Sequence, residues 1–526
     1  MVPDRTAEDE LEVKSASKGK CAHLPLSKRV TKQVFRSWRT SQRSFLFTVT
    51  GFFLKFQSRF SWTEALSRRI AGVSCRIVAV VLLSILGLAP AVGVSARTPY
   101  VDTSTPPVVV ERLESSALGL SLQQLHRRRY SPTNQGILVE TLDGSKILAE
   151  LNPNLPFNPA SVMKVATSFL ALCQLGPYYR FRTSVYSETK INPVNKTLVG
   201  DLFVVSDGDP VLRQAEARSL AKTLVRGGLR TVQGDLVIVG PFILDECGTA
   251  ARSKEQLRRL LVRSGVRITG KIEWAPEGSL DTESKVLLLT HLSPRLQDIL
   301  WVQNAHSVNE IADRLGDVLG GAEALQQFLI DVTQVSPDDI FVSRPSGLEH
   351  NRITARAAVN LLRQLYTWLN QHNMKMQDVI PVAGIDEGTL AWRFRDSDYR
   401  GAILGKTGTN PSKDGGISSL AGIAYTHDHG PVLYVILNSH GRITAYRRWQ
   451  DEFLKRVIAE SGGVGEYLSG HEEFINLYLP SAWVPSEYWT VDPEPAVAQR
   501  TAPKKSRGHS RRYASQRKYS SRPAGN

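Results

Sequence analysis

The apolar positions along the chain form three kinds of run, and each predicts a different structure. Residues 77–94 are an 18-residue stretch without a charged side chain, which is close to the length that crosses a bilayer. From Val162 to Cys173 the apolar residues fall on nearly every side of a helix, so this helix is predicted to be buried. Between residues 219 and 273, helical spacing gives way to short β-branched runs. We therefore expect a mixed fold, α/β or α+β.

The region between residues 219 and 273 contains two similar units. Residues 219–238 and 256–273 each have a helical apolar spacing, a glycine stop at Gly228 or Gly265, and then a β-branched strand. They predict a small inserted α/β module, which we place at residues 205–283. None of its residues has the pattern of a catalytic group. Its expected role is to control substrate access or to position the protein on a cell wall.

The charge is concentrated at the two ends of the chain. The formal net charge is +15; residues 1–76 hold 15 basic and 6 acidic side chains, residues 492–526 hold 9 and 2, and residues 97–491 keep 41 and 42. A nucleic-acid enzyme carries its basic patch on the folded domain, so we expect no nucleic-acid partner. The tail, placed at 481–526, is predicted to be disordered and to contact anionic envelope polymers, or to act only as a solubilising tail.

The uncharged stretch predicts export from the cytoplasm. Arginines precede it, and Val94-Ser95-Ala96 resembles a cleavage site, so residues 77–96 are predicted to be a signal peptide. The alternative is an uncleaved membrane anchor. In both cases the positive-inside rule places the rest of the chain in the periplasm or cell envelope. The basic region 1–76 is expected to be missing from the mature protein, or to reflect a start codon placed too far upstream.

Ser161 and Lys164 form a Ser-x-x-Lys motif at the start of the predicted buried helix. A serine hydroxyl needs an adjacent base to attack at neutral pH, and residues three apart on a helix share a face. The same spacing occurs at Ser187 and in the charge-rich ends. Only Ser161 follows an Asn158-Pro159 pair, which predicts an N-cap and a proline at the first helical position. We expect Lys164 to take the proton of Ser161.

Two further motifs follow in the chain. Ser307-Val308-Asn309 is predicted to form a short loop that leads into an amphipathic helix, with Ser307 relaying a proton to the leaving group and Asn309 binding the substrate backbone. Lys406-Thr407-Gly408-Thr409 ends a strand-like run, where Lys406 and Thr407 are expected to hold a substrate carboxylate and Gly408 to let the substrate lie along the strand. The three motifs in this order indicate an active-site serine acyl-transfer enzyme.

The chain resembles the class C low-molecular-weight penicillin-binding proteins, which are D-alanyl-D-alanine carboxypeptidases and endopeptidases of peptidase family S13. The resemblance covers roughly residues 110–460, although Val308 stands where the family usually has a polar residue. Besides the three motifs, it rests on the segments 159–161, 175–181, 200–205, 208–210, 346–348, 351–354, 381–386 and 418–422.

The resemblance implies both a fold and a function. It implies a penicillin-recognising serine hydrolase (β-lactamase/transpeptidase-like) fold, built from residues 97–204 and 284–480 around the inserted module. It also implies a serine-type D-Ala-D-Ala carboxypeptidase, with a possible endopeptidase activity, that forms an acyl-enzyme on Ser161. The expected partners are peptidoglycan D-Ala-D-Ala stem peptides, with β-lactams as inhibitors, and no cofactor or metal is expected.

Other functions remain open at this point. A β-lactamase uses the same Ser-x-x-Lys chemistry and differs in how fast water clears the acyl-enzyme. A catalytically silent wall-binding protein could keep the fold, but it has no need of both Ser161 and Lys164. A histidine triad is disfavoured because His306 adjoins Ser307 without a Gly-x-Ser-x-Gly elbow. A metallopeptidase is disfavoured because His471-Glu472-Glu473 lacks the second histidine of a His-Glu-x-x-His site.

Overall fold

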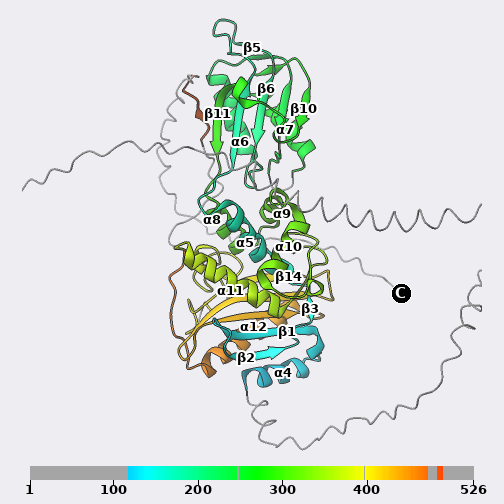
Figure 1. The fold of residues 1–526 in the computed structure, drawn as a ribbon, viewed down its shortest axis with the longest axis vertical. Coiled ribbons are helices and arrows are strands. Elements are labelled where there is room, and N and C mark those ends of the chain that lie inside the picture. Colours follow the sequence, from blue (N-terminus) through cyan, green and yellow to red (C-terminus); the bar gives the residue numbers. More distant parts are fainter. Residues whose placement is uncertain (1–115, 246–247, 396, 472–481, 488, 490–526) are drawn as a thin grey trace, which may run out of the picture. The chain divides into compact units, whose positions relative to one another are not determined.

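The structure, a computed structural model, describes residues 116–245, 248–395, 397–471, 482–487 and 489 (Figure 1). The predicted basic region 1–76, the predicted signal or anchor at 77–96 and most of the predicted tail lie outside the described residues. Within the described ranges, none of the helices has the length and apolar content needed to span a bilayer.

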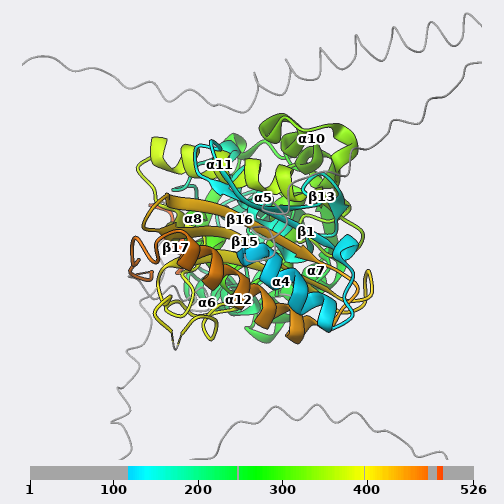
Figure 2. The same cartoon turned by 90° about the horizontal axis from the view of Figure 1, so that it is seen from below.

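An antiparallel sheet of five strands carries the third sequence motif on its edge strand, β14. Its strand order is β14-β15-β16-β1-β2, and side chains along the strands alternate between two apolar clusters, one on each face. Helix α11 packs on one face, whereas α12 and α4 pack on the other (Figure 1, Figure 2). The strands are β1 (Gln135–Thr141), β2 (Ile147–Leu151), β14 (Ile403–Asn410), β15 (Ile417–Thr426) and β16 (Gly430–Asn438).

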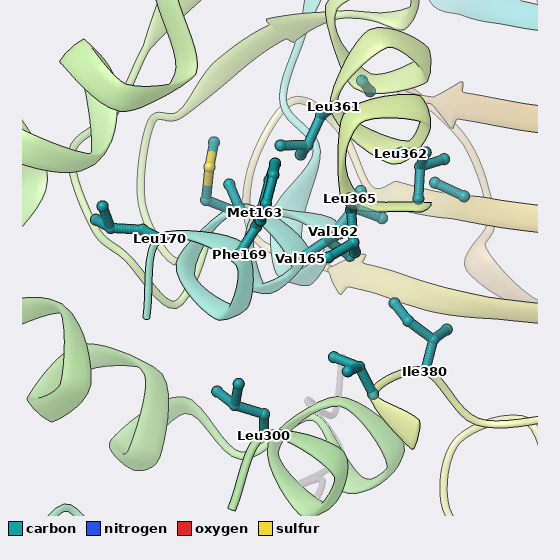
Figure 3. Packing of buried hydrophobic residues seen from close by; sticks show 14 of the residues in the cluster. Val162, Met163, Val165, Phe169, Leu170, Leu300, Leu361, Leu362, Leu365 and Ile380 are labelled. Carbon is teal, nitrogen blue, oxygen red and sulfur yellow. The ribbon is translucent and has the colours of Figure 1, made fainter. Parts of the chain in front are cut away.

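Helices gather around α5 on the α11 face of this sheet. Val162 and Met163, at the start of α5, lie beside Leu361 of α11 in one apolar cluster (Figure 3). The prediction of a buried helix is confirmed for residues 163–172, but the prediction that Cys173 is buried was wrong, because it lies at the exposed end of the helix. The helices are α4 (Ala117–Arg127), α5 (Met163–Leu175), α8 (Leu296–His306), α9 (Asn309–Val318), α10 (Gly321–Thr333), α11 (Ala355–Gln371) and α12 (Ile443–Glu460).

The inserted module is built on a second sheet with the order β10-β8-β6-β4-β11-β17. Strands β6, β8 and β10 run parallel, and helices α6 and α7 pack together beside them. Strands β5, β7 and β9, which precede β6, β8 and β10 in the chain, form a separate small parallel sheet. The elements are β4 (Arg182–Ser187), β5 (Thr197–Val199), β6 (Leu202–Ser206), α6 (Gln214–Arg226), β7 (Thr231–Gln233), β8 (Leu236–Val239), α7 (Ala250–Arg263), β9 (Arg267–Ile268), β10 (Ile272–Ala275), β11 (Val286–Leu292) and β17 (Val484–Pro485).

The two predicted helix–glycine–strand units are confirmed, and a related strand pair precedes them. Each strand is divided in two at a glycine, giving β5/β6 at Gly200, β7/β8 at Gly234 and β9/β10 at Gly270. The Asp201 carboxylate accepts a 2.7 Å hydrogen bond from the backbone N–H of Asp235, and the Asp235 carboxylate accepts one of 2.7 Å from Lys271. These aspartates join successive steps of a three-step ladder, of which the sequence periodicity revealed only two.

The sheet of the module extends beyond the boundaries predicted for it. Strands β4 and β6 begin before residue 205 and β11 follows residue 283, so the predicted module 205–283 cuts through one sheet. We propose wider boundaries, near residues 182 and 292, for the module, and correspondingly narrower ones for the catalytic domain.

A segment after the catalytic core also belongs to the module. Trp483 is buried in its apolar cluster and donates a 2.8 Å hydrogen bond from Nε1 to Glu216 O, while β17 pairs with β11. Trp489 donates from Nε1 to Gly227 O at 3.0 Å. The prediction of a disordered tail from residue 481 was therefore wrong at its start, because large apolar side chains hold this segment in place.

Short elements complete the described chain. A small sheet with the order β12-β13-β3 joins the segment before Ser161 to the region before α11. These elements are β3 (Pro156–Phe157), β12 (Ile340–Phe341) and β13 (Arg352–Thr354), with 3₁₀ turns η1 (Pro132–Asn134), η2 (Ala160–Val162), η3 (Thr282–Ser284), η4 (Pro337–Asp339) and η5 (Met376–Asp378).

Candidate active site

Ser161 lies in a strained turn that leads into α5. The turn is the 3₁₀ element η2, and α5 itself begins at Met163, so the prediction of Pro159 at the first α-helical position was wrong. Asn158 still caps the turn, because its Oδ1 accepts a 3.0 Å hydrogen bond from Ala160 N. Ala160 has φ = 47°, a left-handed conformation that costs a residue with a Cβ free energy. The strained residue, Ala160, directly precedes Ser161 in the chain.

Lys164 is fully buried and its amine reaches three oxygen atoms. Nζ lies 3.0 Å from Ser161 Oγ, 2.7 Å from Asn309 Oδ1 and 2.6 Å from the carbonyl oxygen of Ser346. Burial lowers the pKa of the lysine to about 7, against an opposing effect of the Asp313 and Glu310 charges. Near neutral pH a large fraction of this amine is therefore unprotonated.

The predicted Ser307–Asn309 loop is confirmed in its geometry. Helix α8 ends at His306, Ser307 takes a left-handed conformation with φ = 57°, and Asn309 is the first residue of α9. Asn309 thereby reaches Lys164, although it lies far along the chain. Ser307 is half-buried in the turn between the two helices, two positions from Asn309.

The Lys406–Thr409 motif lies on the edge strand β14. Lys406 is fully buried, and its Nζ donates to Thr407 O at 2.9 Å. Burial lowers its pKa well below the usual value, and the positive charge of Lys164 lowers it further. Thr407 Oγ1 donates to Thr389 Oγ1 at 2.8 Å, and Arg447 Nη2 donates to Thr409 Oγ1 at 2.9 Å. The two threonines thus belong to a polar group that the sequence motif did not include.

Gly408 has a packing role that the sequence did not reveal. A Cβ at this position would come within 2.3 Å of Pro159 O and 3.0 Å of Ser419 Cβ. Only glycine therefore allows β14 to lie against the turn that carries Ser161. Access of a substrate to the strand edge, the role predicted for Gly408, stays a prediction.

The loop behind Lys164 contains residues 346–348, which form part of the family resemblance in the sequence but had no predicted role at the site. Ser346 supplies a carbonyl oxygen to the amine, and its own N–H donates to Asp313 Oδ1 at 2.9 Å. Asp313 also forms a 2.8 Å ion pair with Arg344. Because Asp313 lies four residues after Asn309, both fall on one face of α9. The four-residue spacing of Asn309 and Asp313 is the feature of the sequence that could have indicated this part of the site. A contact made by a backbone carbonyl oxygen leaves no pattern of residues in the sequence.

Gly347 gives a test of this loop. Its φ is +82°, and a Cβ there would stand 1.9 Å from Ala160 O. We expect Gly347→Ala to lower stability by about 2 kcal/mol or more, from left-handed strain plus displacement of the Ser161 turn, and to slow acylation. Thermal unfolding and penicillin labelling measure the two effects.

Gly278→Ala is the matched control. Gly278 also has a left-handed backbone, φ = +74°, but nothing lies within 4 Å of an added Cβ. An equal loss of stability in both variants would show that backbone strain alone is responsible, and that the loop does not press on the Ser161 turn.

The residues of the disfavoured alternatives have other contacts. His306 Nε2 lies 3.2 Å from Glu387 Oε1, with both side chains substantially exposed. The ring of His471 stacks on Trp301 with centroids 4.7 Å apart, whereas Glu472 and Glu473 lie outside the described residues. Within the ranges that are described, no group of His, Cys, Asp and Glu side chains is arranged to hold a metal ion.

The site and the fold together define a class of protein. A five-stranded antiparallel sheet, a serine in the turn that leads into a buried helix, and a buried lysine three residues after it are the features of the penicillin-recognising serine hydrolases. The chain belongs within this class to the D-Ala-D-Ala carboxypeptidase 3 (S13) family, whose sequence pattern matches residues 122–240 and 243–454.

Individual relatives are more distant. The chain is 29% identical over 119 residues to the D-alanyl-D-alanine carboxypeptidase DacB of Haemophilus influenzae, and 34% identical over 100 residues to a D-alanyl-D-alanine carboxypeptidase of Actinomadura sp. strain R39. These matches cover 23% and 19% of this chain, and 24% and 18% of the relatives' own lengths. They support the family assignment and leave the activity of the whole protein to be established.

Solved structures confirm the fold. The peptidoglycan endopeptidase Bd3459 of Bdellovibrio bacteriovorus superposes with a TM-score of 0.54 at 19% identity, covering 67% of this chain and 98% of that one. Penicillin-binding protein 4 of Haemophilus influenzae gives a TM-score of 0.52 at 19% identity, covering 61% and 95%. The predicted penicillin-recognising serine hydrolase fold is therefore confirmed.

Proposed function

We propose that this protein is a serine-type D-Ala-D-Ala carboxypeptidase that acts on peptidoglycan stem peptides through an acyl-enzyme on Ser161. The observation that carries the proposal is the environment of the Lys164 amine. Two of its three oxygen neighbours, Asn309 Oδ1 and Ser346 O, are carbonyl oxygens that can only accept a hydrogen bond. A neutral amine has two N–H groups and one lone pair. When the N–H groups satisfy the carbonyls, the lone pair faces the Ser161 hydroxyl.

This arrangement supports a two-step acyl transfer. Ser161 Oγ attacks the carbonyl carbon of the penultimate D-Ala while its proton passes to Lys164 Nζ, and the C–N bond breaks as the leaving D-Ala amine gains a proton through Ser307. Lys164 gives up its proton in this relay and is neutral again when water attacks the ester on Ser161. It then takes a proton from the water and returns it to Ser161 Oγ as the C–O bond breaks and the carboxylic acid leaves. The second lysine, Lys406, is buried near the first, and its pKa is lowered by burial and by the positive charge of Lys164.

The substrate carboxylate is proposed to lie at the end of β14. This strand is at the edge of its sheet, so a peptide can align beside it by strand addition. Thr407 and Thr409 present hydroxyls at this end, supported by Thr389 and Arg447. Lys406 adds positive charge beneath them when it is protonated, and together these groups fit a terminal D-Ala carboxylate.

Two extensions of this function follow. Cleavage of peptide cross-links by the same acyl-enzyme is proposed as a second activity, consistent with a fold shared with a peptidoglycan endopeptidase. β-Lactams, which resemble the scissile dipeptide, are proposed to acylate Ser161 as inhibitors. We also propose export to the periplasm or cell envelope, because peptidoglycan lies there and residues 77–96 have the pattern of a signal or anchor.

The test is to incubate the protein with a fluorescent penicillin and then with a D-Ala-D-Ala muropeptide. Stable labelling with D-Ala release supports the carboxypeptidase. Rapid loss of the label by hydrolysis, without D-Ala release, identifies a β-lactamase instead. Absence of both reactions leaves the catalytically silent wall-binding protein.

The pH dependence of acylation follows from the pKa of Lys164. Attack needs the unprotonated amine, and its pKa is about 7. Well below that pH the protonated fraction dominates, so the acylation rate should fall tenfold for each unit of pH; above it the rate should level off. Stopped-flow labelling between pH 5 and 9 measures the curve. A rate that stays flat across this range would exclude Lys164 as the titrating base.

Thr407→Val tests the proposed carboxylate site. Loss of one charge-assisted contact of about 1.5–3 kcal/mol should lower kcat/KM for pentapeptide cleavage by roughly 10- to 150-fold. Cleavage of a cross-linked dimer should suffer less if its acceptor strand presents another group there. Chromatography of muropeptide products gives both rates.

Thr389→Val is the matched control for this prediction. It removes the hydrogen bond between the two threonines but keeps the Thr407 hydroxyl. A loss in Thr389→Val as large as that in Thr407→Val would assign the effect to the lost threonine pair. Equal losses on both substrates would show that Thr407 serves the shared acylation step.

A further inference from the structure

A cavity of about 400 Å³ lies away from the Ser161 site, between the module and α9. One wall consists of the loops that follow the parallel strands β6, β8 and β10, represented by Asp207, Pro241 and Glu277. The opposite wall is the second half of α9, with Asp317 and Val318. Loops at the carboxyl ends of parallel strands are where ligands bind in open α/β sheets.

The cavity wall carries more carboxyl groups than cationic side chains. Asp207, Glu277 and Asp317 all line it, and among the residues that are described none of the three forms an ion pair. Burial raises the pKa of Tyr179 to about 12, and the charges of Asp207 and Glu277 raise it as well. Both carboxylates therefore lie close enough to the phenol to act on its charge, and all three residues line the cavity.

The nearby arginines offset only part of this negative charge: the charge of Arg314 lowers the pKa of Asp209, and that of Arg344 lowers the pKa of Asp317. Arg314 lines the cavity, but its Nη1 donates to Pro210 O at 3.2 Å and its Nη2 to Asp245 O. Arg344 is paired with Asp313 at 2.8 Å. The backbone N–H of Arg182 donates to Asp207 Oδ2 at 3.3 Å. The positive charge of Arg182 also lowers the pKa of Asp207, although its side chain forms no ion pair with this carboxylate.

A fourth carboxyl group in the lining has an unused oxygen. Asp209 is almost completely buried, and its Oδ1 accepts from Val211 N at 2.9 Å. Its Oδ2 has no hydrogen-bond partner, since the nearest candidate, His291 Nδ1, is 3.9 Å away. Burial raises the pKa of Asp209 to about 7. A buried carboxyl oxygen without a donor costs free energy, and Asp209 is one of the residues that line the cavity.

The rest of the lining is apolar. Leu175, Tyr179, Ile243 and Val318 provide aliphatic and aromatic surface between the carboxylates. We propose that this cavity binds an aliphatic ammonium group, in which the hydrocarbon stem contacts the apolar wall and the ammonium donates to Asp207, Glu277 and Asp317. The ligand is a free diamine or the amine-ended side chain of a peptide.

The cavity is separate from the Ser161 site but shares a helix with it. Asn309 begins α9 beside Lys164, and Asp317 lies eight positions later on the same helix, about 12 Å along its axis. A ligand in the cavity therefore does not occupy the acylation site, and the two sites can be filled together.

The experiment is calorimetric titration of the full chain with 1,5-diaminopentane, Nα-acetyl-lysine amide and 1-pentanol. The two amines should bind and the uncharged alcohol should not; a preference between the amines identifies the source of the ammonium. Glu277→Gln and Asp317→Asn should each weaken amine binding by about tenfold or more. Lowering the pH to 5 should also weaken binding, because the pKa of Asp209 is about 7 and its carboxyl group is then protonated.

Glu273→Gln is the matched control, because Glu273 is an exposed acid on β10, four residues before Glu277, and does not line the cavity. Amine binding that persists after penicillin has acylated the protein supports a separate site. The proposal is overturned if pentanol binds as well as the amines, if neither amine binds, if Glu277→Gln behaves like Glu273→Gln, or if acylation abolishes binding. Failure of the protein to react with penicillin would contradict the proposed enzyme function and leave the amine titrations unaffected.

Discussion

Replacing Ser161 with alanine should abolish covalent penicillin labelling of this protein. The Ser161 hydroxyl is the only one described within hydrogen-bonding distance of the Lys164 amine, and its removal leaves no nucleophile there. Intact mass should show no adduct in Ser161→Ala, and peptide mapping of the wild-type protein should place the adduct on the peptide that contains residue 161. D-Ala release should fall by several orders of magnitude, as expected when a covalent nucleophile is lost.

The chain provides its own control for this experiment. Ser187 has the same spacing to a lysine, Lys190, but its Oγ donates to Thr189 O at 2.8 Å and it lies on β4 of the module. Ser187→Ala should label like the wild-type protein. An adduct that survives in Ser161→Ala, or one that maps to another serine, would refute the assignment of the nucleophile.

Replacing Lys164 with arginine should lower the acylation rate by about 10² to 10⁴, the usual contribution of a positioned general base. The positive charge is retained, but a guanidinium does not deprotonate in proteins and has no lone pair for the Ser161 proton. Stopped-flow labelling measures the rate, and the residual reaction should lack the midpoint at about pH 7 that is expected for the wild-type protein.

Two further variants separate chemistry from damage to the fold. Lys164→Met keeps the length of the side chain without a base and should be as slow as Lys164→Arg. Lys413→Arg changes a lysine that is paired with Glu349 at the surface and should react normally. Near-wild-type acylation in Lys164→Arg, with thermal unfolding unchanged, would show that another group accepts the proton.

The sequence predicted the parts of the site that depend on local spacing. Ser161 and Lys164 are three residues apart, and the structure brings their side chains within 3.0 Å. The loop at Ser307 and the strand at Lys406 were also predicted, because helix ends and β-branched runs have local signals. The contact between Asn309 and Lys164 could be predicted only from the order of the three motifs along the chain, because neither residue alone indicates its partner.

Contacts made by backbone atoms were beyond such reasoning. The Ser346 carbonyl is part of the site through its main chain, which no side-chain pattern reveals. The close packing of Gly347 and Gly408 against the Ser161 turn depends on tertiary structure. The module boundary was misplaced for a related reason: β4 and β11 join its sheet by pairing across the insertion, and a composition change does not mark long-range strand pairing.

The ladder of the module has a consequence for how the chain can vary in length. Each aspartate fixes only the next step, so the steps form a short one-dimensional array in which neighbours interact and distant members do not. The series stops at Lys271, because an ammonium cannot accept a hydrogen bond from a further backbone N–H. A further step would need a hydrogen-bond acceptor in place of Lys271, whereas the strands that join the module to the catalytic core, β4 and β11, lie away from this edge of the sheet and would not change. Growth by repetition at a terminated edge would allow the size of the insertion to evolve independently of the chemistry at Ser161.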